Sequence, residues 1–543
     1  MDRGGYSPGP LLAARFFDDF FAHQLSVSMN RPVVGFWLLA FVAEPLAAQF
    51  PRLAPPPPCR ASFSAPALLS YWPGAARGNR PKVAVFSLQP DVDDANKVYL
   101  AFSLPDRIRQ RLSEDPRLRV ATEWSVSRAM VDARSRQDSA GKLLDADYIA
   151  TGRLLIQGDR QEIEVMLQRP GKPAPLWQAS FRATTSLRSI EESIVRGLSR
   201  ALGLPSAPPI PRGWPRGDAG HEAILAGDAH MRSTTRAGAD SAMTFYERAL
   251  SLEPGSSVAA SRLARASVTL LERGGQLPGH PGSAGPRRVN ELVTRALEMD
   301  SSAEGWTTRA MLARIVDPVR FAGALDAHLR AVTVDPRDAD AEHEYGITLM
   351  RLGDLRGAEA RFRRALQLSP GRAPTFAALA WMDLQASRWD AACVMSNASI
   401  AAWPYDPLPY AVRAEARLRL SDARDAYSDA EMVRRLAAGA WPEALRVLVT
   451  NGSSNIDEAR RQVMSLTGTW LGPGTQFTVR DAEYLALAYL AMGDQRRAVE
   501  SLRRARPVGA DLRAALRSPR LAAIRKDTAV VRMLAESEGR NRE

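Results

Sequence analysis

One pattern of side chains returns at a spacing of 34 residues in the second half of the chain, and it constrains the fold more than any other feature. Its clearest copy has small Ala358 and Ala365 on either side of Phe362, followed by Pro370. The alanines let two helices approach closely, the ring fills the gap between them, and the proline ends the second helix. The copies one period earlier and later are Ala324, His328, Ala331 and Pro336, and Ala392, Ser396, Ser399 and Pro404.

This pattern resembles the tetratricopeptide repeat (TPR), a helix–turn–helix unit of about 34 residues. Divergent copies occur at Ala242–Pro254 and at Leu485–Ala505. Because one unit cannot bury its apolar face alone, the units must stack. The sequence therefore predicts an all-α TPR superhelical solenoid of about seven or eight units over residues 218–510. The prediction includes an inserted loop at 274–282, degenerate units near 407–438 and 440–470, and C-terminal helices over 511–543.

Ahead of the repeats, residues 80–204 alternate short apolar strands with helical patterns. Val83–Phe86 and Leu118–Val120 are predicted strands, and Tyr99–Leu112 carries apolar residues four apart, as a helix does. Further strands are expected in Asp147–Gly152, Ile163–Leu167 and Leu176–Phe181, with a closing helix near 189–202. This order predicts a small α/β domain with a mixed sheet.

The succession of strands, together with Leu144–Gly152, resembles the TolB amino-terminal-like domain. In that family the corresponding block usually has Leu-Glu where this chain has Ala150-Thr151. The domain accompanies TPR units in CadC-like bacterial regulators and in some kinase- and cyclase-associated proteins. The resemblance brings no catalytic residue with it.

Proline-rich stretches over residues 49–79 and 205–217 block regular structure and are predicted to be linkers. We therefore expect residues 80–204 and 218–543 to fold as separate units, with proteases cutting near Pro205–Gly217.

The N-terminal region has the features of an export signal. Residues 1–32 are expected to be a disordered extension, and Met29 is an alternative start. Val33–Ala43 is apolar and leads to the small residues of Leu46–Ala48, so residues 33–48 are predicted to be a signal peptide or a short membrane anchor. The chain would then be periplasmic or anchored in the inner membrane. If residues 33–48 are instead a buried helix, the chain is cytoplasmic.

The net charge of +12 does not indicate nucleic-acid binding, because the arginines are spread over helical patterns that also carry acids. Nearly all 72 basic residues are arginine, which is typical of a GC-rich bacterial genome. The two cysteines, Cys59 and Cys393, are too few for a disulfide framework or a thiolate metal site.

The sequence offers little catalytic chemistry. Its six histidines form no His-x-x-x-His or His-Glu-x-x-His set, and it has no phosphate-binding loop and no Gly-x-Ser-x-Gly elbow. His328 stands where a repeat needs its aromatic filler, so we expect it in the core. The chain is predicted to be no enzyme and to hold no cofactor or metal.

Three functions fit this organisation. The first is a non-enzymatic interaction scaffold that binds a protein or peptide in the concave groove of the solenoid. The second is the sensory half of a CadC-like membrane-linked signalling or transcription regulator without its DNA-binding domain. The third is an accessory subunit of a separately encoded kinase or cyclase.

The TPR resemblance assigns eight residues of first helices to the groove. They are Trp306, Arg309, His343, Arg351, Trp381, Gln385, Glu415 and Arg419. The family's chaperone-binding clamp of lysines and asparagines is missing, so we expect an extended acidic or aromatic peptide, bound by ion pairing and stacking. The alternative is that Trp306 and Trp381 only pack against a neighbouring helix.

Overall fold

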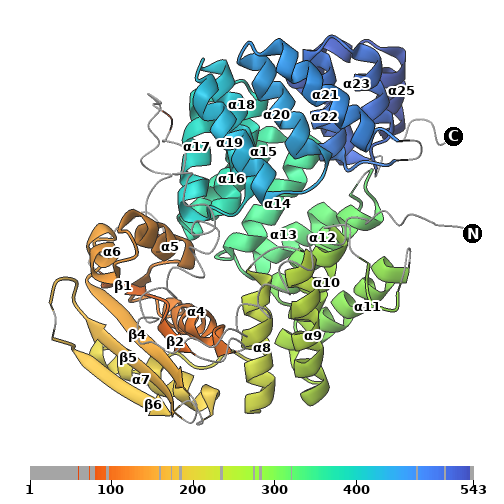
Figure 1. The fold of residues 1–543 in the computed structure, drawn as a ribbon. Helices are drawn as coiled ribbons and strands as arrows, with labels where there is room; N and C mark the ends of the chain where they lie inside the picture. Colours follow the sequence, from red (N-terminus) through yellow and green to blue (C-terminus); the bar gives the residue numbers. More distant parts are fainter. Residues whose placement is uncertain are drawn as a thin grey trace, which may run out of the picture.

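The structure is a computed structural model. It describes residues 59, 72–73, 80–92, 97–157, 160–172, 174–182, 186–232, 236–272, 276–280, 284–319, 321–472, 475–506 and 509–537. A small α/β domain is followed by a long curved stack of helices (Figure 1).

The α/β domain holds a mixed sheet with the strand order β3-β1-β4-β5-β6, and β2 pairs separately with β4. Its strands are β1 (Lys82–Val85), β2 (Gln89–Val92), β3 (Arg119–Val120), β4 (Tyr148–Gln157), β5 (Arg160–Gln168) and β6 (Trp177–Arg182). Strands β3, β1, β2 and β4 pair in parallel, whereas β4, β5 and β6 pair antiparallel. The predicted mixed sheet is confirmed, but β2 was not predicted, because Pro90 lies within it.

Helices cover both faces of this sheet. They are α4 (Leu100–Ser113), α5 (Glu123–Asp132), α6 (Gln137–Leu143) and α7 (Leu187–Ala201). Successive side chains of a strand point to opposite faces. Accordingly, Val83 and Val85 pack in one core with α4 and α7, while Ala84 and Phe86 pack in another with α5 and α6.

The solenoid consists of consecutive antiparallel helix pairs. They are α8 (Asp218–Met231) with α9 (Arg236–Leu252), α10 (Ser257–Glu272) with α11 (Ala284–Met299), α12 (Ala303–Val316) with α13 (Ala324–Val334), α14 (Ala339–Leu352) with α15 (Leu355–Leu368), α16 (Ala373–Gln385) with α17 (Trp389–Ala402), α18 (Pro407–Arg419) with α19 (Ala423–Leu436), α20 (Ala440–Gly452) with α21 (Ile456–Trp470), and α22 (Val479–Ala491) with α23 (Gln495–Arg503). The predicted solenoid is confirmed. The chain then continues into α24 (Ala510–Arg517), the 3-10 helix η4 (Pro519–Ile524) and α25 (Thr528–Ser537).

The large side chains of the 34-residue pattern are buried between the helices, as the pattern predicts. Phe362 is fully buried, and a Cβ placed on Gly346 would lie 2.6 Å from the Phe362 ring, so only glycine admits the ring there. Helix α15 ends at Leu368, just before Pro370. The expectation for His328 is met: its fully buried ring stacks at 5.2 Å on Tyr345.

The two parts of the chain share one core. Apolar side chains of the sheet, of α4 and α7, and of α8 to α12 form one continuous cluster. The stretch 205–217 belongs to it, because Trp214 is buried and its ring lies 3.7 Å from the Arg107 guanidinium. This packing runs across the predicted boundary at 205–217, whereas separate folding of residues 80–204 and 218–543 and cleavage between them stay predictions. Proline excludes helix and strand from a stretch, but it does not exclude burial.

A buried charge cluster also joins the two parts. Glu191 on α7 is fully buried and lies 3.3 Å from Arg107 and 3.0 Å from Arg111, both on α4. His221 on α8 lies 3.0 Å from its other carboxylate oxygen. Burial alone would raise the pKa of Glu191, but the His221 contact and the two arginines lower it to about 2. The carboxylate is therefore ionised, and its charge binds α4 and α7 to α8.

A second contact joins the α/β domain to the middle of the solenoid. Ser125 at the start of α5 donates a hydrogen bond of 2.8 Å to the carbonyl of Pro370. Gly371 has φ +82°, and a Cβ there would lie 3.0 Å from the backbone carbonyl carbon of Trp124. Glycine at 371 thus permits the close approach.

The predictions for residues 1–58 lie outside the described residues. Among the described helices, none combines the length and the apolar character needed to cross a bilayer.

Candidate partner-binding surface

The first helices of the units line up along the solenoid and form its inner face. In the described residues α10 contacts α12, and α12 contacts α14. Further along, α16 contacts α18, α18 contacts α20, and α20 contacts α22.

Ion pairs occupy this face between α10 and α14. Arg314 bridges Glu272 at 2.7 Å and Glu344 at 2.8 Å, and Arg265 lies 3.5 Å from Glu344. Burial would raise the pKa of Glu344, but Arg314 and Arg265 outweigh it and hold this pKa far below its usual range. The carboxylate stays charged, so these residues link three consecutive first helices.

Two of the eight predicted groove residues contact second helices. Trp306 donates a hydrogen bond of 2.8 Å to Ser301, and the Arg330 guanidinium of α13 lies 4.8 Å from its ring. Arg309 donates to Thr294 of α11 at 2.8 Å. Both residues thus contact second helices, and their role in a groove stays a prediction.

His343 lies inside the helix stack, because its side chain is 6% exposed. Its Nδ1 lies 3.1 Å from the hydroxyl of Thr375, and its ring lies 5.6 Å from Phe362. Burial, reinforced by nearby Arg372, lowers the pKa of His343 to about 3. The neutral, buried imidazole thus joins α14 to α16 through Thr375.

Four other predicted residues come together on one segment that does not belong to any repeat. Arg351 pairs with Asp511 of α24 at 3.3 Å. Gln385 accepts a hydrogen bond from Ser518, which precedes η4. Trp381 and Glu415 both contact Arg520 of η4, as described below.

The last of the eight, Arg419, is exposed at the end of α18, with its guanidinium 5.8 Å from the ring of Trp389. Sequence reasoning missed Glu483 and Tyr484 of α22, which meet Arg520 at the same place as Glu415. The repeat pattern marks the packing residues of α22, but it carries no signal for a contact with a segment outside the repeats.

The sequence family described as the cilia and flagella-associated protein 70 middle TPR-like domain matches residues 296–506. This match does not include residues 80–204, so their resemblance to the TolB amino-terminal-like domain stays a prediction. No curated protein matches the sequence.

Three solved structures resemble parts of the chain at low TM-scores. The Cut9–Hcn1 hetero-tetramer of APC/C is 12% identical with a TM-score of 0.41; the match covers 65% of this chain and 60%, less than two thirds, of the other. Yeast Tom70 is 13% identical with a TM-score of 0.35, covering 82% and 85%. PilF of Pseudomonas aeruginosa is 21% identical with a TM-score of 0.32, covering 42% and 98%. By its own elements the chain combines a small α/β domain with a helical solenoid, of which residues 296–506 match a TPR-like family.

Proposed function

We propose that the chain is a non-enzymatic scaffold that binds a protein or peptide on the inner face of its solenoid. One observation carries the proposal: Arg351, Trp381, Gln385 and Glu415 all contact a single segment outside the repeats. The face therefore has the width and the polar groups to hold a peptide segment. Solenoids generally present such extended concave surfaces to partners.

Affinity capture with the full chain tests this function. The bait is the tagged chain in an extract of its native cells, and captured proteins are identified by mass spectrometry. The double variant Arg351→Ala/Trp381→Ala should weaken capture of the partner by about 2 kcal/mol or more, the scale of interface hot spots. Leu329→Ala, an exposed position on second helix α13, is the matched control.

Circular dichroism must show unchanged helix content in each variant. Capture that survives the double variant, or that Leu329→Ala removes equally, would contradict binding at this face.

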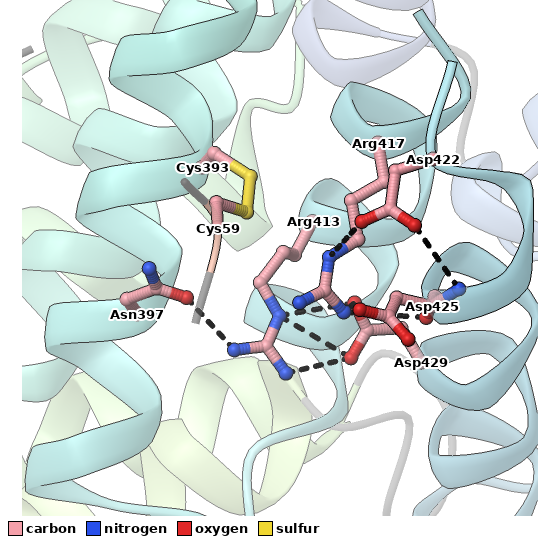
Figure 2. Close-up of a disulfide and its surroundings, with 8 residues drawn as sticks. All are labelled: Cys59, Cys393, Asn397, Arg413, Arg417, Asp422, Asp425 and Asp429. Atoms are coloured by element: carbon pink, nitrogen blue, oxygen red, sulfur yellow. Dashed lines mark hydrogen bonds and ion pairs between the residues drawn. A yellow bond between two sulfur atoms is a disulfide. The ribbon is translucent and has the colours of Figure 1, made fainter. Parts of the chain in front are cut away.

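The proposed location is an oxidising compartment outside the cytoplasm. Support comes from the apolar stretch Val33–Ala43 and from the pairing of the chain's two cysteines in a Cys59–Cys393 disulfide (Figure 2). Their Cα atoms are 6.0 Å apart, and 334 residues separate them in sequence. Disulfides persist in oxidising compartments and are rare in the cytosol.

A phosphatase reporter fused after Ser62 should be active in the bacterium, and intact-mass measurement of the purified chain should find no free thiol. An inactive fusion together with two free thiols would contradict export.

A further inference from the structure

A pocket of two carboxylates and two aromatic rings closes around Arg520. Its Nη1 donates to Glu483 and its Nη2 to Glu415, each at 2.7 Å. The guanidinium carbon lies 5.0 Å from the ring centroid of Trp381 and 5.0 Å from that of Tyr484. First helices α16, α18 and α22 supply these four side chains, whereas Arg520 comes from η4.

The charge of the pocket requires a cation. The side chains of Glu415 and Glu483 are 15% and 5% exposed, and Arg520 is the cation that they share. Tyr484 donates its hydroxyl to Glu415 at 2.7 Å, which fixes the carboxylate but brings no positive charge. Without a cation, two carboxylates would stand close together and largely out of water, which is strongly unfavourable.

The geometry favours a guanidinium over an ammonium. One planar group places a separate N–H on each carboxylate while its central carbon lies over both rings, which is the recognition that arginine performs and lysine does not. Ser518 helps to fix the backbone of Arg520 at the pocket, because its hydroxyl accepts a hydrogen bond of 3.2 Å from the backbone N–H of Arg520.

The segment that brings Arg520 behaves as a bound peptide on the inner face. In the ten residues that end at Arg520, Asp511 forms an ion pair with Arg351 and Ser518 donates a hydrogen bond to Gln385. The ion pairs of Asp511 and Arg520 with Arg351, Glu415 and Glu483 all run to first helices. One acid and one arginine of the segment therefore contact opposite charges on the same face. Within this segment, the acidic group contacts Arg351, as expected for an acidic ligand. The neighbouring pocket of Glu415 and Glu483 instead holds a basic group, the guanidinium of Arg520.

We propose that this pocket is an arginine-binding site, that residues 509–524 are its intramolecular ligand, and that a partner segment binds through an arginine that takes the place of Arg520. This inference rests on the proposed scaffold function and names the chemistry of its partner.

The segment's apolar side chains set how strongly the pocket is held closed. Leu512, Leu516, Leu521 and Ile524 are all buried in the core that ends the solenoid. They keep Arg520 beside the pocket, where a tethered ligand has an effective concentration on the order of millimolar. A partner segment must bind more strongly than the tethered Arg520 at this effective concentration. We therefore expect the pocket to bind only segments that make further contacts on the same face.

Chemical rescue tests the pocket in the full chain. Arg520→Ala should lower the thermal midpoint, and millimolar ethylguanidinium should restore it, whereas ethylammonium should not. Arg520→Lys should also be destabilised, because one ammonium replaces two separated donors. Arg532→Ala removes an exposed arginine on α25 and should respond to neither compound. No rescue, or equal rescue by both compounds, would overturn the assignment of a guanidinium site.

A peptide supplied in trans tests the exchange. A labelled peptide with the sequence of residues 509–526 should bind the Arg520→Ala chain at least ~10-fold more tightly than the wild-type chain, because the tethered segment then no longer fills the pocket with an arginine. The same peptide carrying the Arg520→Ala change should bind neither chain. Equal binding to both chains, or no binding to the variant, would show that residues 509–524 are a fixed cap.

Neither experiment needs the natural partner, so their failure is separate from failure of the scaffold function. Suppose that Arg351→Ala/Trp381→Ala abolishes capture of a partner, but ethylguanidinium does not rescue Arg520→Ala. That combination would support the scaffold function and refute the arginine-binding site.

Discussion

A buried ion cluster between α18 and α19 gives the sharpest test of how this solenoid is held together. Arg413 and Arg417, one turn apart on α18, both reach Asp429 on α19 (Figure 2). Arg413 donates three hydrogen bonds to the carboxylate, at 2.7, 3.0 and 3.2 Å, and the three side chains are 0–3% exposed. One buried carboxylate thus neutralises part of the charge of two buried guanidinium groups.

The perturbation is Asp429→Ala. It leaves both arginines buried, with Asn397 accepting one bond of 2.8 Å from Arg413 and Asp422 lying 3.6 Å from Arg417. Removing one partner of a buried ion pair lowers the free energy of unfolding by about 3–5 kcal/mol, because the remaining charge stays desolvated. Asp429→Asn should cost nearly as much, since it keeps the shape but removes the charge.

Asp457→Ala is the matched control on the same solenoid. Its partner Arg460 is 3.7 Å away, and the two side chains are 70–83% exposed. Exposed pairs contribute about 0–1 kcal/mol, so this variant should be almost neutral.

The assay must report on single units, because a repeat array can unfold in steps. Hydrogen exchange measured by mass spectrometry gives the opening free energy of α18 and α19, and urea unfolding of the full chain gives the global effect. Equal effects of Asp429→Ala and Asp457→Ala, or a loss below about 1 kcal/mol at Asp429, would refute the reasoning.

Three further predictions concern the tether, the domain contact and pH. Reducing the Cys59–Cys393 disulfide should destabilise the chain by about 2–4 kcal/mol, and Cys393→Ser should make the thermal midpoint insensitive to reductant. Gly371→Val should detach α5 from the solenoid, seen as faster amide exchange in α5, because its Cβ would meet the Trp124 backbone at 3.0 Å; unchanged exchange would contradict this. Burial lowers the pKa of His328 and His343 from 6.5 to about 3, so the unfolded chain binds protons that the folded chain does not. Stability should therefore fall as the pH drops from about 6.5 towards 3, and His328→Gln should flatten the change in urea midpoint between pH 7 and pH 5.

Local patterns in the sequence determine the elements and the packing within each unit. Small residues beside Phe362, followed by Pro370, require two close helices that end at a fixed place, and His328 follows as a core residue. The apolar run Val83–Phe86 likewise predicts a buried strand, and both of its faces are indeed packed in cores. These inferences succeed because each depends on side chains only a few residues apart.

Contacts between distant parts were decided by tertiary structure alone. The core shared across 205–217, the disulfide between Cys59 and Cys393, and the entry of Arg520 between α18 and α22 join residues that no pattern links. The entry of Arg520 depends on the curvature of the solenoid, which accumulates from small rotations between many units. A side chain on a first helix looks the same in sequence whether that curvature leaves it in solvent or brings the end of the chain onto it.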